Sequence, residues 1–288
     1  MKMTKIFILI AVLALVSLAC GLTVNIPVDR VTTGPTRTED INVPAPVADE
    51  VDLTLSFGAG EFVLNPGAGE ALVNGTARYN VDDFKPEISV DSNQVKIESG
   101  ELKIEGLPRI NNDIINEWDL KLGNQPMNLM INAGAYKGDF ELGGLSLKSL
   151  KVSDGAADVE LKFSSINPVE MESLSYQTGA SSVRLTDLAN ANFASMVFRS
   201  GAGDYTLDFS GELKRDAQVA IESGISQVTI IVPEGFSAQV SFQGGLTNIE
   251  THGGWQKSGN DYMLNGSGPT LTITVDMGAG NLVLRTAP

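Results

Sequence analysis

The sequence has very little of what catalytic sites are usually made of. Its 288 residues include one cysteine, Cys20, and one histidine, His252, and only 6% are aromatic. Cys20 lies at the predicted start of the mature chain, and His252 stands alone beside a glycine-rich stretch. Because nucleophilic catalysis by Cys, or by Ser with His, needs a second group to activate the nucleophile, we expect no site of this kind.

Positive charge is also scarce, with 20 Lys and Arg against 35 Asp and Glu and a net charge of −15. This balance disfavours nucleic acid and bare anionic membrane surfaces as partners. Gly58-Ala59-Gly60 lies between two predicted strands, whereas a dinucleotide-binding loop opens a helix. Asp158 and Asp204 fall two repeats apart, too far to share a calcium ion. We therefore expect no cofactor and no metal.

The chain does contain one repeated sequence motif. An apolar–x–apolar pair is followed by two further residues and then Gly, and a second such pair begins four residues after that Gly. The motif recurs about every 22 residues, which is the signature of a stacked array of repeats. The marker glycines are Gly58, Gly134, Gly155, Gly179, Gly201, Gly224, Gly245 and Gly278.

The alternation of apolar residues on both sides of each glycine predicts strands. The alternation slips by one position at the glycine, so the chain must bend or bulge there, and we expect glycine to supply a positive φ. A return segment follows, such as the one with Ile166, Val169 and Met171. The pattern predicts an all-β solenoid of parallel coils with three short sides. An antiparallel β-sandwich or barrel, in which the glycines mark hairpin turns, is the alternative.

If neighbouring repeats stack in register, residues at equivalent positions of the repeats become neighbours. It places Glu160 beside Arg184 and Arg199 beside Glu222, both pairs facing outward. The last copy of the motif, Leu271 to Leu284, is expected to close the C-terminal end of the stack.

The N-terminus is typical of an export signal over residues 1–19, with a short apolar core after Lys2 and Lys5. Cys20 follows Leu18-Ala19 directly, which resembles a bacterial lipoprotein signal whose cysteine is lipidated, although Leu usually stands three residues before the cysteine. We expect a membrane partnership through this lipid. Ordinary cleavage after Ala19, giving a secreted protein, is the alternative.

Three further segments follow. Residues 20–50 are rich in Pro, Thr and acidic residues and predict an extended tether. Residues 51–126 form an atypical N-terminal β unit with a hairpin at 88–97, and residues 127–288 carry the regular coils. An insertion near the end contains Trp255 and Tyr262, which are a candidate platform for stacking a sugar, or else a lid on the last coil.

Four segments carry a resemblance to a known family. They are Gly58-Ala59-Gly60-Glu61, Ala77-Arg78-Tyr79-Asn80-Val81, Lys85-Pro86-Glu87 and Asn116-Glu117-Trp118-Asp119-Leu120. They resemble the bacterial toast-rack family, and the second half of the chain is similar to the putative-adhesin repeats that accompany it. The resemblance covers residues 50 to 288. It implies a stacked parallel β architecture in an envelope protein and offers no catalytic residues.

Three hypotheses about function follow. The first is a non-catalytic, envelope-anchored scaffold or adhesin-like protein that binds envelope proteins or glycans. The second is an envelope-stress or antibiotic-response accessory that binds a membrane partner. The third is a glycan-active solenoid enzyme, which we do not favour. Faces made of Ser, Thr, Asn and Gln would support the first, and an acidic pair with aromatic side chains in one groove would support the third.

Overall fold

The computed structural model describes residues 33–100 and 114–287, which belong to one compact unit. This part of the chain is almost wholly strand, with two short 3₁₀ helices. The elements are β1 (Arg37–Pro44), β2 (Val51–Pro66), β3 (Ala71–Tyr79), η2 (Asp82–Phe84), β4 (Pro86–Asp91), β5 (Gln94–Ser99), β6 (Asn116–Leu122), β7 (Met127–Glu141), β8 (Leu147–Lys162), β9 (Met171–Thr186), η3 (Leu188–Ala191), β10 (Phe193–Asp208), β11 (Ala217–Pro233), β12 (Ser237–His252), β13 (Gln256–Ser258), β14 (Asp261–Leu264) and β15 (Thr270–Ala287).

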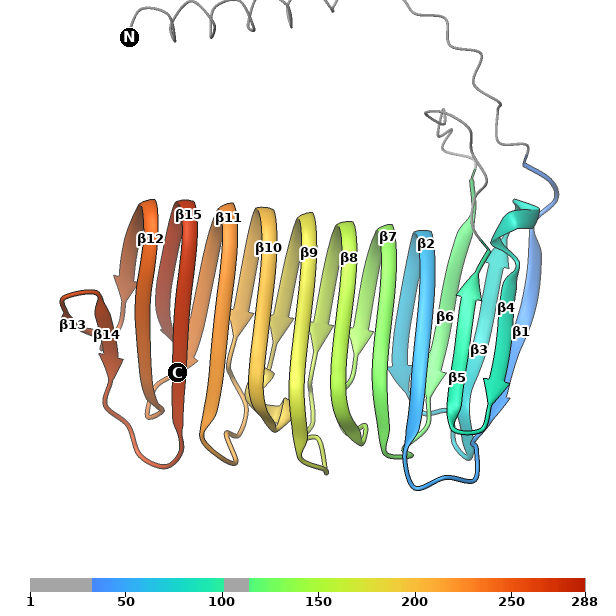
Figure 1. Cartoon of the computed structure of the whole chain (residues 1–288), viewed down its shortest axis with the longest axis horizontal. Coiled ribbons are helices and arrows are strands. Elements are labelled where there is room, and N and C mark those ends of the chain that lie inside the picture. The colour runs from blue at the N-terminus through green and yellow to red at the C-terminus, as the bar shows by residue number, and fades with distance from the viewer. Residues whose placement is uncertain (1–32, 101–113, 288) are drawn as a thin grey trace, which may run out of the picture. The chain divides into compact units, whose positions relative to one another are not determined.

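The regular part is a parallel β-solenoid, as predicted. The strands β2, β7, β8, β9, β10, β11, β15 and β12 lie side by side in that order, and each pairs in parallel with the next. Each is a single long strand that bends at its marker glycine, so its first half lies in one layer and its second half in the facing layer (Figure 1). The antiparallel alternative does not describe these coils.

The two layers enclose one continuous apolar core. The positions five and three before each glycine, and four and six after it, face inward in almost every coil. In β8 these are Leu150, Val152, Val159 and Leu161, each at most 1% exposed. The predicted in-step register is confirmed, because Glu160 pairs with Arg184 and Arg199 with Glu222.

The reason for the marker glycines differs from the one expected. None of the marker glycines has a positive φ. A positive φ is found instead two residues after the marker glycine in three coils, at Gly60, Gly203 and Gly280. A Cβ on Gly179 would lie 2.4 Å from the carbonyl oxygen of Gly155 in the neighbouring coil, and the other marker glycines inside the stack meet the same obstacle. Glycine is required because successive backbones approach too closely at the bend to admit a side chain.

Each coil has two strand sides, and the predicted third side is absent from the described residues. The return segments between strands are loops or short 3₁₀ turns such as η3. In the loop after β8, the side chain of Asn167 is 1% exposed and bonds to the backbone of Leu147, at the start of β8, and of Ala191 in η3. These hydrogen bonds satisfy buried backbone groups that a third ladder would otherwise have bonded.

The N-terminal end is capped by additional strands, as expected for an atypical unit. β4 and β5 form the predicted hairpin and extend the first-half layer beyond β2. β6, β3 and β1 extend the second-half layer, with β3 antiparallel to both its neighbours. Because β1 pairs along its length with β3, residues 37–44 are part of the folded cap. The expected free tether therefore cannot extend to residue 50.

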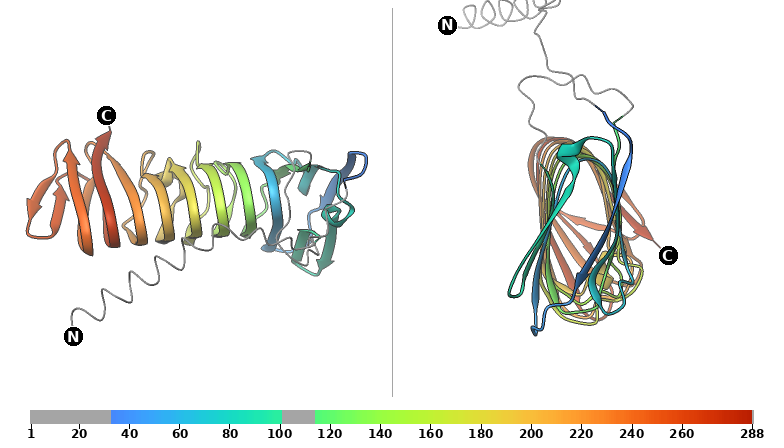
Figure 2. Two further views of the ribbon diagram at one scale, coloured as in Figure 1. Left: turned by 90° about the horizontal axis from the view of Figure 1, so that it is seen from above. Right: turned by 90° about the vertical axis from the view of Figure 1, so that its right-hand side faces the viewer.

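The C-terminal end differs from the prediction. β15, which contains Leu271 to Leu284, does not close the stack but lies between β11 and β12. The terminal coil is β12, and the insertion forms the hairpin β13–β14, which pairs with the first half of β12 (Figures 1 and 2). The connection from β12 to β15 is longer than those between the other coils. It forms the β13–β14 hairpin on the outer side of β12, and the chain then returns to place β15 between β11 and β12.

Candidate interaction surface

The residues that the sequence singled out do not assemble into one site. Cys20 lies outside the described residues. His252 is exposed at the end of β12, with Nε2 4.0 Å from Oε2 of Glu250. Tyr262 on β14 is 2% exposed, so its ring faces are closed to a stacking ligand, and Trp255 packs partly buried against the core. Both aromatic residues help to cover the last coil.

The two outer faces of the solenoid differ in chemistry. We call the outward side of the first halves the first-half face. Most of its positions carry neutral polar side chains, and few carry a charge. Its residues are Asp52, Thr54, Ser56, Asn128, Met130, Asn132, Ser149, Lys151, Ser153, Ser173, Ser175, Gln177, Ser195, Val197, Arg199, Gln218, Ala220, Glu222, Thr272, Thr274, Asp276, Gln239, Ser241 and Gln243.

The outward side of the second halves, the second-half face, is richer in charge of both signs, with more acids than bases. The charged members are Glu61, Lys137, Asp139, Glu141, Asp158, Glu160, Lys162, Arg184, Asp204, Asp208, Glu250 and Arg285. Sequence periodicity predicts which positions face outward. The difference in charge between the two faces becomes visible only when the outward residues of each half are compared over all the coils.

Several hollows open along the first-half face. One, with a volume of about 300 Å³, lies over β2, β7, β8 and β9 and is lined by Asp52, Thr54, Ser149 and Lys151 among others. Within it, Asn128 donates to Asp52 Oδ1 at 2.9 Å and accepts a hydrogen bond from the Ser149 hydroxyl at 2.8 Å. These bonds join side chains from three neighbouring coils.

A second hollow, of about 410 Å³, lies over β9, β10, β11 and β15 and includes Gln177 and Asp276. Arg199 binds Glu222 across it with two hydrogen bonds of 2.9 and 3.1 Å. The hydrogen bonds and charge of Arg199 lower the pKa of Glu222. This exposed ion pair holds the guanidinium in place on the face.

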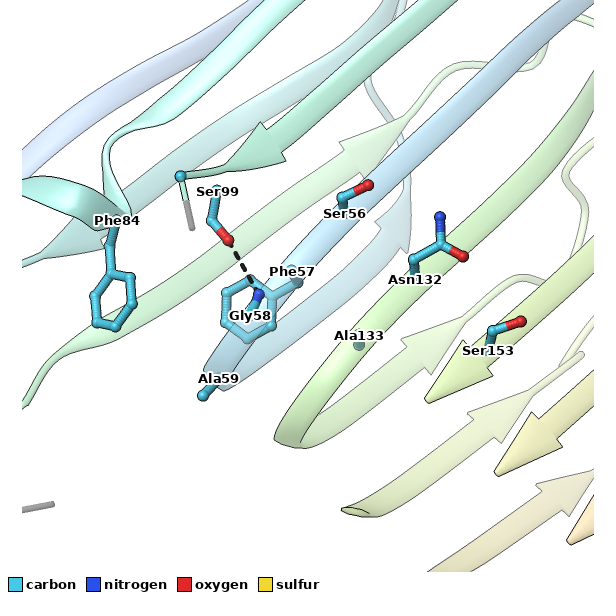
Figure 3. A pocket seen from close by; sticks show the side chains of 10 residues that line it. Ser56, Phe57, Gly58, Ala59, Phe84, Ser99, Asn132, Ala133 and Ser153 are labelled. Carbon is cyan, nitrogen blue, oxygen red and sulfur yellow. Dashed lines mark hydrogen bonds between the residues drawn. The ribbon is translucent and has the colours of Figure 1, made fainter. Parts of the chain in front are cut away.

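The third hollow, of about 630 Å³, lies near the N-terminal cap (Figure 3). Ser56, Asn132 and Ser153 line it from the first-half face, and Phe57 and Phe84 contribute its apolar side. The Ser99 hydroxyl accepts a hydrogen bond of 3.0 Å from the backbone N–H of Gly58 (Figure 3). Its lining residues carry no charge, so it suits an uncharged group with both apolar and hydroxyl surfaces.

Sequence reasoning missed a polar cluster beneath the glycine bend. Asp154 on β8 accepts hydrogen bonds at Oδ2 from the hydroxyls of Tyr136 on β7, at 3.3 Å, and Tyr176 on β9, at 2.7 Å. Its Oδ1 is buried without a hydrogen-bond partner. Burial raises the pKa of Asp154, and burial raises the pKa of both tyrosines. The signal that could have revealed it is an acid directly before a marker glycine, where neighbouring coils carry Ala133 and Thr178.

The two acids that the sequence compared as metal ligands stay apart in the structure. Asp158 and Asp204 occupy the same position two coils apart with Ser182 between them, as the sequence predicts. In residues 33–100 and 114–287, no group of three or more His, Cys, Asp or Glu could hold a metal ion. Within the same residues, no helix has the length and hydropathy needed to cross a bilayer.

The chain is similar to several solved structures, and the first of these shares its fold. A putative cell adhesion protein from Clostridium sporogenes is 20% identical, with a TM-score of 0.52 over 88% of this chain and 100% of that one. A putative adhesin from Bacteroides fragilis, at 10% identity and a TM-score of 0.40, covers 89% of this chain and 99% of its own. A putative lipid binding protein from Parabacteroides distasonis, at 11% identity and a TM-score of 0.41, covers 88% of this chain and 99% of its own.

Among curated proteins, none matches the chain. The model of one family does match it, over residues 32–172 and again over 165–231. Together these matches span well over half of the chain and cover the N-terminal cap and the coils from β2 to β11. The chain therefore belongs to the family of the N-terminal domain of toast_rack, DUF2154.

Proposed function

We propose that this protein is a non-catalytic, adhesin-like scaffold of the bacterial envelope, which binds its ligand through the first-half face. The observation that carries the proposal is the composition of this face, where neutral hydrogen-bonding side chains continue across every coil. Hydroxyl and amide groups bind uncharged polar ligands without the desolvation cost of charged groups. The hollows described above all open on this face, which gives a ligand concave surface to occupy.

The fold shared with the Clostridium sporogenes protein, which is described as a putative cell adhesion protein, is consistent with this role. Lipid attached to Cys20 would keep the scaffold at the membrane. At about 0.8 kcal/mol per buried CH₂, one acyl chain binds reversibly and two or more anchor firmly. The alternatives of a stress-response accessory and a glycan-active enzyme have no observation of their own in the described residues.

The proposal is tested by binding to isolated envelope material, both protein and glycan fractions, with the full chain immobilised. Ser173→Glu with Ser175→Glu places two charges in the middle of the first-half face. Ser182→Glu with Thr186→Glu is the matched control, because it places the same charges on the second-half face of the same strand. We expect the first pair to lose a bound component that the control pair retains. Equal retention by both pairs, or no retained component, would show that the proposal is wrong.

A further inference from the structure

The second-half layer ends, at β12, in a stretch of strand with a free side. The second half of β12 pairs with β15 through Leu246 to His252. On its other side, β14 pairs only with the first half, over Ala238 to Ser241, and Phe242 N–H bonds to Asn260 at 3.0 Å. No described strand pairs with that side of residues 246–252, which we call the open edge.

The core is also incompletely covered at this edge. In the adjacent β15 the two inward residues of the second half, Leu282 and Leu284, are fully buried. The corresponding residues of β12 are Ile249, which is only partly buried, and Thr251, which is exposed. The hydroxyl of Thr247, within the open edge, is buried without a hydrogen-bond partner. One more strand would cover Ile249 and offer polar backbone groups next to Thr247.

A second copy of the chain does not fit this edge. If copies stacked end to end, β14, β13, β4 and β5 would fill the first-half layer between them, while only β1, β3 and β6 would fill the second-half layer. The layers would then differ by one strand, about 4.8 Å. In a two-fold pairing of open edges, both β13–β14 hairpins would project over the same side of the joined sheet and collide. A single extended strand meets neither obstacle.

We propose that the open edge of β12 binds an extended segment of a partner protein, which adds one strand to the second-half layer. Such strand addition takes its affinity from main-chain hydrogen bonds and its specificity from alternate side chains. The segment carries an apolar residue to cover Ile249 on the inward side. It carries no acid beside Glu250 on the outward side, where a basic residue is favoured by charge. This inference does not depend on the ligand of the first-half face.

The experiment uses the full chain and a labelled peptide with the sequence of residues 279–287. That sequence already pairs in parallel with residues 246–252 on their other side, so its register with this strand is known. Leu282 and Leu284 supply its apolar side, and Arg285 supplies a basic residue on the outward side, opposite His252 and two positions from the neighbour of Glu250. A peptide with Leu282→Asp and Leu284→Asp is the control. We expect the first peptide to bind and the second not to bind, measured by fluorescence anisotropy.

Ile249→Lys places a charge on the inward side of the open edge, a device that blocks strand pairing in natural sheets. Ile88→Lys makes the same change in β4, whose Ile88 is 45% exposed at the opposite end of the stack. We expect Ile249→Lys to weaken peptide binding by about tenfold or more, equivalent to about 1.4 kcal/mol, and Ile88→Lys to leave it within about twofold.

Hydrogen exchange in the unaltered protein gives a readout that does not depend on how well the variants fold. Peptide binding is expected to slow exchange of amides within residues 246–252. The proposal is overturned if the peptide does not bind, if these amides are not protected, or if the two lysine variants bind equally well. Sedimentation showing a dimer that Ile249→Lys dissociates would also overturn it, because a second copy would then occupy the edge.

Discussion

The hydroxyl of Tyr176 donates a hydrogen bond of 2.7 Å to Oδ2 of Asp154 in the preceding coil. The other carboxyl oxygen, Oδ1, is buried and has no hydrogen-bond partner. Burial penalises the charged carboxylate and raises its pKa, while the hydrogen bonds from Tyr176 and Tyr136 oppose that shift. Asp154 therefore binds its proton more tightly in the folded protein than in the unfolded chain.

This shift predicts a pH dependence of stability. Because the folded pKa of Asp154 is raised, its contribution to the unfolding free energy is most favourable below the unfolded pKa of about 3.9. The contribution falls as pH rises through the raised folded pKa and is lowest above it. Asp154→Asn keeps an acceptor for the tyrosine hydroxyls without the charge. We expect this variant to be more stable than the natural chain at neutral pH, with a flatter pH profile above pH 4.

Chemical denaturation at several pH values checks this prediction. Asp158→Asn is the control, because Asp158 lies on the exposed outer side of the same strand. It should leave the profile nearly unchanged. Destabilisation by Asp154→Asn at every pH would contradict the assigned cause and would indicate that the charged carboxylate is needed by the tyrosines.

The glycine bend makes a second prediction. Gly179→Ala would place a Cβ 2.4 Å from the carbonyl oxygen of Gly155, so the two coils must separate. We expect a loss of about 1–3 kcal/mol in unfolding free energy, the usual range for overpacking. Gly58→Ala is the matched control, since the nearest atom to its Cβ is the Ser99 hydroxyl at 3.6 Å, an ordinary contact. Thermal or urea unfolding should separate the two variants, and equal losses would contradict the close-approach explanation.

The position of β15 makes a third prediction. A chain that ends after Pro269 lacks β15 and would leave β11 and β12 without the strand that joins them. We expect β12 and its hairpin to become sensitive to limited proteolysis, while the coils before β11 stay resistant. Replacing residues 253–264 with a short flexible linker is the comparison, because it removes only the terminal hairpin. Proteolysis of β12 to the same extent in both variants would count against the interior position of β15.

The N-terminal cysteine makes a fourth prediction. In a bacterial host, labelled palmitate should be incorporated into the natural chain and not into Cys20→Ser. The Cys20→Ser protein should leave the membrane fraction, since its lipid would be lost. Absence of label from both proteins would show that the chain is not a lipoprotein and would support simple secretion.

Much of the coil geometry can be predicted from local pattern. The alternation around Leu150, Val152, Val159 and Leu161 specifies which side chains enter the core, because a strand has a period of two and a slip moves every side chain to the other face. The spacing of the glycines specifies the neighbours of each residue, including Arg199 and Glu222. The candidate face could be predicted only position by position, and its contrast with the second-half face required all coils together.

Other features depend on contacts that no single segment encodes. The reason for Gly179 lies in the carbonyl of Gly155 in another coil, and the environment of the half-buried Asp154 depends on tyrosines contributed by β7 and β9. From the sequence alone, the ring of Tyr262 is a candidate for stacking on a ligand. In the structure β14 pairs with β12, and Tyr262 is a buried core residue.

By itself, the sequence determined the strand type, the period of the coil and the inward rows, because these follow from the alternation and from glycine spacing along the chain. Only the tertiary structure decided that β15 lies inside β12 and that β12 therefore carries the open edge. The physical reason is that coils with the same apolar rows can pair with one another in more than one order. The connection between them, and the hairpin that it builds, selects the order that forms.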